Sequence, residues 1–183
     1  MKSSSFKSLN NIIKLIMAIK TIITEPNKIL RQKSLSVDKI GKEEQRLMDD
    51  MLETMYNAKG IGLAAIQIGV PKRIIVMDIS KNDEKNDPMC FVNPLIKNKI
   101  LETSTYEEGC LSVPNFFAEI DRPKKCDVEY LDYNGEKKKL NAEGLLATCI
   151  QHEMDHLEGI LFIDYLSKLK KTMIYEKTIK TKR

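Results

Sequence analysis

The segment QHEMDHLEG, residues 151–159, contains both histidines of this 183-residue chain. His152 and His156 are four residues apart, and Glu153 directly follows the first. On a helix this spacing places both imidazoles on one face, where they can bind one metal ion. Glu153 can then reach a metal-bound water without being a ligand. Because a catalytic metal site needs a third protein ligand, the segment raises the question of where that ligand lies.

A helix over residues 141–159 (NAEGLLATCIQHEMDHLEG) would carry these histidines. Asn141 is its candidate N-cap, and Gly159 is placed to end it. With 3.6 residues per turn, one face presents four side chains: Leu145, Cys149, His152 and His156. Cys149 is too far away to be the third ligand, because it lies about 7.5 Å along the axis from the midpoint of the histidines. Cys149 is therefore expected to line the site as a small apolar residue.

The other three cysteines differ in their surroundings. Cys126 begins a predicted hairpin and Cys90 lies in the apolar stretch MCFV, so both are interpreted as structural. Cys110 lies in EGCLS, residues 108–112, where the preceding glycine permits close backbone approach and Glu108 offers a carboxylate to hold a ligating histidine. These surroundings favour Cys110 as the third ligand.

Two other interpretations remain open from the residues alone. A downstream acidic third ligand, such as Glu158 or Asp164, would make the chain a zinc endopeptidase of the HExxH type, which cleaves internal peptide bonds. A non-catalytic module that binds the ribosome could instead hold a structural metal. A structural zinc site is expected to have four protein ligands, however, and the sequence offers three.

The rest of the chain predicts helices mixed with antiparallel strands. Residues 42–59 have an apolar stripe at helical spacing, and Gly60 is placed to cap that helix. RIIVMDI, residues 73–79, is predicted to be a buried strand. CDVEYLDYNGEKKKL, residues 126–140, predicts a hairpin around its Asn-Gly pair. Since no regular βαβ alternation is present, the expected fold class is α+β with antiparallel sheets.

Composition and charge limit the class of protein. Hydrophobic and charged contents of 42% and 31% are ordinary for a globular domain, and no apolar run approaches the roughly 20 residues that span a bilayer. The four cysteines show no CxxC spacing, which favours a reducing compartment. Residues 1–20 carry four lysines and no acid, and residues 168–183 carry seven basic residues and one acid. With a formal charge of +4 for the chain, residues 21–167 are left with −6.

The first sixteen residues are predicted to be an extension, either disordered or an organellar targeting segment, with Met17 as an alternative start. They lack the unbroken apolar region and small-residue cleavage site of a secretory signal. The expected location is therefore the cytoplasm of a bacterial-type cell, with organellar targeting as the alternative.

Three motifs together resemble the signature motifs of peptide deformylases: GIGLAAIQ at 60–67, EGCLS at 108–112 and HEMDH at 152–156. Their order and separations also fit, and the likeness extends over about residues 17–167. GIGLAA alone matches a loose dinucleotide-binding fingerprint, but it follows a predicted helix and not a strand. The expected fold then has antiparallel sheets packed around a central metal-binding helix that carries HExxH, with a basic C-terminal helix.

The resemblance implies a metal site of Cys110, His152 and His156, with a water in the fourth position. One divalent ion is implied, Fe²⁺ natively, and the ligand types also accept Zn²⁺ or Ni²⁺. Glu153 would be the general base that takes the water proton and the acid that delivers it to the leaving amine.

The resemblance also implies groups that bind the substrate. The side-chain amide of Gln67 and the backbone N–H of Leu111 would stabilise the oxyanion. Backbone at Ile61–Gly62 and at Gly109 would pair with the substrate as an added strand. The pocket for a methionine side chain would be formed by Ile61, Leu145 and Cys149.

The implied function is removal of the formyl group from N-formylmethionine of newly synthesised proteins, with release of formate. Residues 17–167 would form the catalytic domain, preceded by the extension at 1–16 and followed by a basic helix or tail at 168–183. Four apolar residues are expected near one side of a helix over 166–183: Leu166, Leu169, Met173 and Ile174. The expected partners are N-formylmethionyl nascent peptides and, through phosphate contacts of the basic tail, the ribosome. Neither membrane nor DNA is an expected partner.

Overall fold

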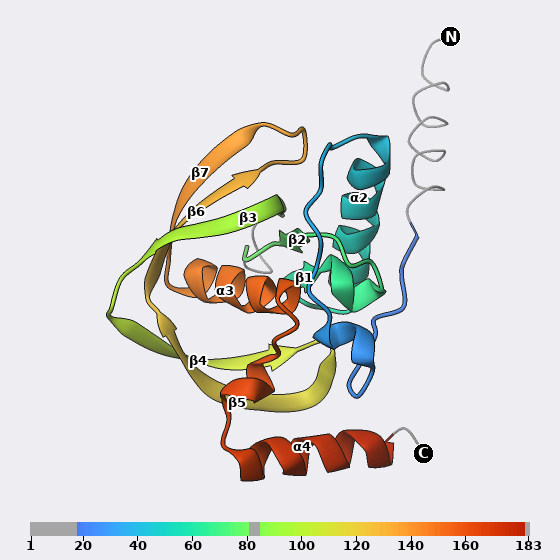
Figure 1. The fold of residues 1–183 in the computed structure, drawn as a ribbon, viewed down its shortest axis with the longest axis vertical. Coiled ribbons are helices and arrows are strands. Elements are labelled where there is room, and N and C mark those ends of the chain that lie inside the picture. Colours follow the sequence, from blue (N-terminus) through green and yellow to red (C-terminus); the bar gives the residue numbers. More distant parts are fainter. Residues whose placement is uncertain (1–17, 81–84, 182–183) are drawn as a thin grey trace.

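The structure is a computed structural model that describes residues 18–80 and 85–181 (Figure 1). The extension predicted at residues 1–16 lies outside the described residues. None of the helices in the described part combines the length and the apolar character that crossing a bilayer requires.

Two antiparallel sheets and three helices make up the described chain. The five-stranded sheet has the strand order β1 (Gly62–Ala64), β2 (Ile74–Met77), β3 (Met89–Lys99), β6 (Lys125–Leu131) and β7 (Lys137–Glu143). The second sheet pairs β4 (Thr103–Cys110) with β5 (Val113–Pro123). The helices are α2 (Lys42–Asn57), α3 (Leu145–Leu157) and α4 (Lys168–Thr181), and single 3-10 turns are η1 (Lys28–Arg31), η2 (Ala65–Ile68) and η3 (Phe162–Tyr165). Neighbouring strands in both sheets are antiparallel, which confirms the expected α+β class.

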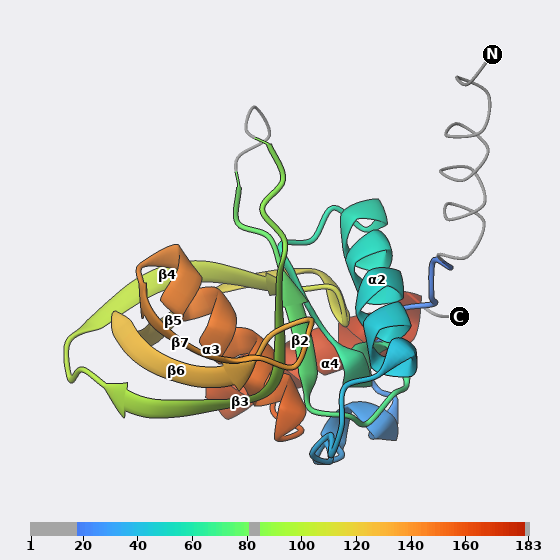
Figure 2. The same ribbon diagram turned by 90° about the horizontal axis from the view of Figure 1, so that it is seen from above.

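Helix α3 lies between the two sheets (Figure 1) and contacts β1, β2 and β7 of one sheet and β5 of the other. Helix α2 packs against β1 and β2 from the other side, as the view from above shows (Figure 2). Strand β2 is therefore covered on both faces, and all four of its residues are fully buried. This explains why residues 74–77 are all apolar instead of alternating with polar ones. The buried strand therefore packs against α3, the helix that carries the histidines.

The apolar residues of α2 form the core that supports β1 and β2. Met48, Met51 and Met55 are fully buried against Leu63 and Val76. Burial of each such side chain contributes about 1.5–3 kcal/mol. The methionines predicted as a stripe are thus structural, and they hold the short strand β1 close to the functional helix.

The β4–β5 ribbon brings Cys110 to helix α3. Residues 103–109 pair regularly with residues 117–123, but the register shifts between Gly109 and Cys110, and Cys110 then pairs with Val113. Such an irregularity re-aims the side chain that follows it. Cys110 therefore leaves the plane of the ribbon at its tip, where it meets the helix.

The predicted start of the HEMDH helix at Asn141 is wrong. Residues 137–143 form β7, in which Asn141 pairs with Asp127 and donates from its side-chain amide to that carboxylate at 2.6 Å. The helix begins at Leu145, after Gly144 with φ of 59°. Asn and Gly suit both a helix start and a strand end, so the long-range pairing with β6 decides between them. The hairpin predicted over 126–140 is confirmed, and the buried strand predicted at 73–79 is present as the shorter Ile74–Met77.

Two details at helix ends also differ from prediction. Helix α2 ends at Asn57, and the left-handed residue that follows is Lys59, not Gly60. The four apolar residues predicted near one side of a helix over 166–183 do not share one side, and Leu166 precedes α4. Leu166 and Ile174 pack against a cluster with Ile120 and Phe162, whereas Leu169 and Met173 are exposed.

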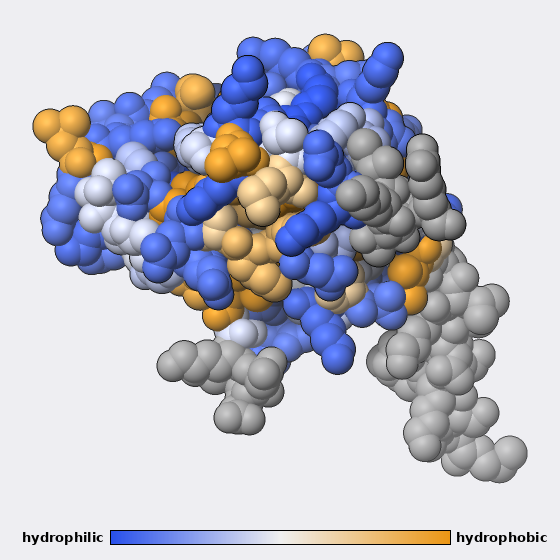
Figure 3. Space-filling view, turned by 90° about the horizontal axis from the view of Figure 1, so that it is seen from below, coloured by the Kyte–Doolittle hydropathy of each residue, from blue (hydrophilic) through white to orange (hydrophobic). Residues whose placement is uncertain are grey.

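Figure 3 shows the face on which α4 lies, where hydrophobic residues gather near the middle within a largely hydrophilic surround. Lysines of α4, among them Lys168 and Lys170, are exposed. The described part of the tail is therefore a basic helix with some apolar side chains on its outer surface.

Candidate metal centre

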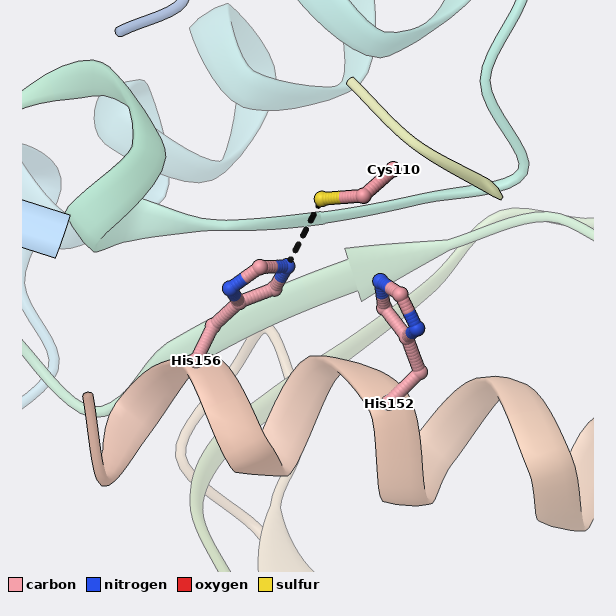
Figure 4. A group of neighbouring side chains, drawn as sticks. All are labelled: Cys110, His152 and His156. Atoms are coloured by element: carbon pink, nitrogen blue, oxygen red, sulfur yellow. Dashed lines mark hydrogen bonds between the residues drawn. The ribbon is translucent and has the colours of Figure 1, made fainter. Parts of the chain in front are cut away.

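Cys110, His152 and His156 meet between the tip of the β4–β5 ribbon and helix α3 (Figure 4). One ligand atom of each residue lies within 4.8 Å of the others, and Cys110 Sγ is 3.3 Å from His156 Nε2. Both histidines are at least nine-tenths buried. The spacing of His152 and His156 on α3 follows from the helical repeat, whereas Cys110 is brought in by the strand pairing of β4 and β5.

A buried carboxylate orients the first histidine. His152 Nδ1 lies 2.8 Å from Glu108 Oε2, and since a carboxylate only accepts, Nδ1 carries the hydrogen. The other ring nitrogen, Nε2, is then the atom available to a metal. Glu108 is itself held by Arg122, which donates from Nε at 2.5 Å and from Nη2 at 3.0 Å. The predicted role of Glu108 beside a ligating histidine agrees with this contact.

The two histidines differ in their proton affinity. Burial alone would lower the pKa of His152, but its contacts with Cys110 and Glu108 raise that pKa well above its ordinary value. Burial lowers the pKa of His156 well below its ordinary value, and the nearby charges of His152 and Arg122 lower it further. His156 is therefore neutral, the form in which an imidazole binds a metal.

Glu153 lies beside the centre without being part of the ligand group. It is 4% exposed, and its Oε2 is a buried atom with no hydrogen-bond partner among the described residues. Burial raises the pKa of Glu153 to about 7. A Cβ at Gly62 would overlap the carboxylate of Glu153, so the glycine of β1 leaves the space in which this carboxylate lies. A carboxylate with a pKa near neutrality is suited to exchange protons.

Gln67 lies on the other side of Cys110. Its Nε2 donates to Ser112 Oγ at 3.1 Å and approaches Cys110 Sγ at 3.6 Å, while its Oε1 accepts from the backbone N–H of Ala64 at 2.8 Å. The side chain is 1% exposed, so Gln67 is not an ordinary surface glutamine. Its amide is fixed at both ends, and its N–H groups point toward the sulfur and the space beside it.

A cavity of about 440 Å³ opens onto the centre. Its lining includes ten of the eleven residues predicted as metal ligands, catalytic groups or substrate contacts: Ile61, Gly62, Gln67, Gly109, Cys110, Leu111, Leu145, Cys149, His152 and Glu153. His156 is the exception, because it lies behind the cavity wall at 1% exposure. Ile61 and Leu145 are large apolar side chains that remain 46% and 42% exposed in this cavity. The site therefore offers apolar surface beside its polar groups.

The downstream acids considered as a third ligand are engaged elsewhere. Glu158 forms ion pairs with Lys33 and Arg73, and Asp164 pairs with Arg31 at 2.5 Å and with Lys171. Neither belongs to the group of ligand atoms found within the described residues. Those surroundings remove the basis for an acidic third ligand.

The sequence analysis predicted Glu108 but not the residues that hold Glu108 in turn. Arg122 is 4% exposed and contacts both Glu108 and Asp155, and Tyr165 stacks on its guanidinium group. An arginine within a strand and a tyrosine in a 3-10 turn carry no spacing signal, so only the folded chain brings them together. Ser112 was likewise overlooked as the partner of Gln67.

The donor set fits a divalent transition metal. A thiol and two imidazoles are ligands that zinc, iron and nickel all accept, and the second nitrogen of His152 is oriented by a carboxylate, as ligating histidines usually are. The unpartnered Oε2 of Glu153 is placed beside these donors, where it can hydrogen-bond a water or a substrate.

Comparison with known proteins agrees with this architecture. The family model of polypeptide deformylase matches residues 19–172. A peptide deformylase of Pelagibacter ubique is 72% identical over 166 residues, which is 91% of this chain and 96% of the relative. The crystal structure of peptide deformylase from Ehrlichia chaffeensis in complex with actinonin has a TM-score of 0.88 at 44% identity, covering 91% of this chain and 99% of that one. The chain therefore belongs to the peptide deformylase family, enzymes that remove N-terminal formyl groups.

Proposed function

We propose that this chain removes the formyl group from N-formylmethionine of newly synthesised proteins at the centre formed by Cys110, His152 and His156. The observation that carries the proposal is the convergence of a thiol and two imidazoles within 4.8 Å beside the buried carboxylate of Glu153. The length of the chain supports the same activity, since the match spans nearly all of the curated relatives.

Cys110 Sγ and one nitrogen each of His152 and His156 would hold one divalent ion. When bound, the ion supplies a Lewis acid and lowers the pKa of a coordinated water. We propose Fe²⁺ as the native ion, following the family resemblance, with Zn²⁺ or Ni²⁺ as substitutes that the same ligands accept. Glu108 keeps Nδ1 of His152 protonated and so directs its other nitrogen toward Cys110.

Glu153 moves the protons of the reaction. Its Oε2 takes a proton from the attacking water, whose oxygen forms the new bond to the formyl carbon. The same carboxyl then delivers the proton to the amine nitrogen as the carbon–nitrogen bond breaks, so that formate and a free amino terminus result. A pKa near 7 allows both transfers at neutral pH.

Two hydrogen-bond donors would stabilise the oxygen that becomes negative during the attack. These are the side-chain Nε2 of Gln67 and the backbone N–H of Leu111. Gln67 is held in place by Ala64 and Ser112, so its donor does not have to reorganise. One such donor typically contributes about 3–4 kcal/mol to the transition state.

The substrate would bind between two strands. In the described sheets, β1 is an edge strand and β4 pairs only with β5, so Ile61–Gly62 and Gly109 offer backbone groups to an added strand. The methionine side chain would enter the apolar part of the cavity. That part is formed by Ile61, Leu145 and Cys149.

We further propose how the chain is divided into domains and where in the cell it acts. Residues 17–167 form the catalytic domain, 1–16 an extension and 168–183 a basic tail. The exposed lysines of the tail favour contacts with ribosomal RNA, which would place the enzyme near its nascent substrates in the cytoplasm. Removal of 168–183 should weaken co-sedimentation with ribosomes at low salt, and equal binding of both proteins would reject the ribosome contact.

The test of the proposed reaction uses anaerobically prepared protein loaded with Fe²⁺. Formate release from a formyl-methionyl tripeptide is compared between the natural chain, Glu153→Gln and Glu158→Gln. The proposal expects loss of activity in Glu153→Gln and near-natural activity in Glu158→Gln, which makes the same substitution at a carboxylate that pairs with Lys33 and Arg73. Formate release that is absent from the natural chain, or unchanged in Glu153→Gln, rejects the proposal. Cleavage of an internal bond of an unformylated peptide would support an endopeptidase instead.

A further inference from the structure

Arg122 forms the buried link between Glu108 and the outer part of the molecule. Its Nε and Nη2 donate to the two oxygens of Glu108, and its Nη1 donates to Asp155 Oδ2 at 2.8 Å. Glu108 in turn holds Nδ1 of His152. The position of this histidine therefore depends on a guanidinium group that does not line the cavity.

Tyr165 completes this link from outside. Its ring centroid lies 5.0 Å from the guanidinium carbon of Arg122, and its hydroxyl donates to Asp155 Oδ2 at 2.9 Å. The same carboxylate oxygen thus accepts from both Arg122 and Tyr165. Burial raises the pKa of Tyr165, and the charge of Asp155 raises it further, so the phenol keeps the proton that it donates. One side chain covers the guanidinium face and fixes the carboxylate beside it.

The segment that carries Tyr165 is itself anchored. Tyr165 is the last residue of η3, and the preceding Asp164 accepts from the backbone N–H of Leu161 and pairs with Arg31 and Lys171. The phenol is 51% exposed and is absent from the cavity lining. Its contacts with Arg122 and Asp155 are therefore the route by which it can influence the centre.

We propose that Tyr165 is a positioning residue for the metal centre: by covering Arg122 and fixing Asp155, it holds Glu108 and thereby sets the orientation of His152. The inference rests on the proposed ligand set. An ion pair between charged groups is strong where water is excluded, and removal of the ring would admit water to the guanidinium group. Glu108 would then be held less firmly, and His152 would spend less time in the orientation that binds a metal.

The test measures Co²⁺ binding by competition with a chelator, together with the absorption spectrum of the cobalt protein. Loss of a group that directly orients a ligand typically weakens metal affinity about 10–100-fold, and Tyr165 acts through two intermediate groups. We expect Tyr165→Leu to weaken Co²⁺ affinity by about 10-fold, the lower end of that range, and to alter the cobalt spectrum. Tyr165→Phe keeps the ring but loses the hydroxyl that holds Asp155, so it should weaken the affinity less than Tyr165→Leu does, but by more than about twofold.

Tyr175→Leu is the matched control, since Tyr175 is a tyrosine of similar exposure, 42%, on the neighbouring helix α4. It should leave affinity and spectrum unchanged. Because Tyr165 is absent from the cavity lining, Tyr165→Leu should have a lower kcat and an unchanged KM. Thermal unfolding of the metal-free proteins shows whether the variants are folded, and the conservative Tyr165→Phe provides the comparison if Tyr165→Leu is not.

Two results would overturn the inference. If Tyr165→Leu, or Tyr165→Phe where the former does not fold, binds Co²⁺ within twofold of the natural chain with the same spectrum, Tyr165 does not position the ligand. If the natural chain binds Co²⁺ without a sulfur-to-metal absorption band, the proposed centre itself is wrong and the inference falls with it. The first result leaves the proposed function standing, so the two failures are distinguishable.

Discussion

The substitution Gly62→Ala should disable the enzyme without unfolding it. A Cβ built at Gly62 would lie 2.9 Å from Cδ and 3.0 Å from Cγ of Glu153, and closer still to Oε1, whereas ordinary contact begins at 3.4 Å. The carboxylate would therefore have to retreat by about 0.5 Å or more. Since Glu153 is buried in the helix between two sheets, it can retreat only by leaving the position from which it exchanges protons.

The expected loss follows from that displacement. A misplacement of about 1 Å in a catalytic group can cost about 100-fold in rate, and a general base contributes about 10²–10⁴-fold in total. We therefore expect kcat for formate release to fall about 100-fold in Gly62→Ala. The assay is steady-state deformylation with Fe²⁺-loaded protein, and thermal unfolding records the stability. Gly41→Ala is the control, because the nearest atom to a Cβ at Gly41 is 3.6 Å away.

The backbone of Gly62 is also proposed to pair with the substrate, so a second comparison separates the two effects. Glu153→Asp shortens the carboxylate side chain and removes the atom that a Cβ at 62 would meet first. If the overlap causes the loss, Gly62→Ala should cost much less in the Glu153→Asp background than in the natural chain. An equal penalty in both backgrounds, or a KM effect alone, would refute the reasoning.

Two further predictions concern the centre, and a third concerns the stability of the fold. Gln67→Ala should lower kcat about 10²–10³-fold with little change in KM, because its donor acts on the developing oxyanion; single-turnover rates with formyl-methionyl peptide check this, and an unchanged rate contradicts it. Glu108→Gln should weaken metal affinity about 10–100-fold in chelator competition, whereas an affinity within twofold would show that Glu108 does not orient His152. Burial raises the pKa of Asp78, but hydrogen bonds from Ser80 and Tyr56 outweigh burial and hold this pKa below its ordinary value. Asp78 therefore stabilises the fold above the unfolded-state pKa of about 3.9 and loses that contribution as pH falls through the folded value, so Asp78→Asn should lower the unfolding free energy by about 1–3 kcal/mol at neutral pH. Denaturant unfolding should show this difference shrinking toward about pH 2, and a constant difference would contradict the assignment.

The histidine pair could be predicted because its geometry is local. A spacing of four residues places two side chains on one helix face whatever the rest of the fold does. Cys110 could be favoured as the third ligand only from its neighbours in the sequence. Its approach to His156 depends on the register of β4 with β5, which no single segment encodes. Arg122 and Tyr165 could not be predicted at all, since their partners lie 10 to 43 residues away in sequence.

The prediction of the boundary between β7 and α3 was wrong for the opposite reason. Residues 141–144 have local signals that fit a helix start as well as a strand end, and the competition was decided by pairing with residues 125–127. The tail helix shows the same limit. Its periodic apolar residues predict a helix correctly, but which of them are buried depends on where the helix meets Ile120 and Phe162.

The glycines of the first two motifs show how one residue type can have a meaning that local rules miss. Gly60, Gly62 and Gly109 suggest turns or flexible backbone, and none of them has the left-handed conformation that favours glycine. Each instead leaves the space of a missing Cβ to a neighbouring side chain: Leu111 at Gly60, Glu153 at Gly62 and Phe117 at Gly109. Alanine at these positions should therefore displace a side chain of the site while the backbone remains unstrained. At Gly144 and Gly159, where φ is 59° and 74°, alanine should instead strain the backbone and lower stability.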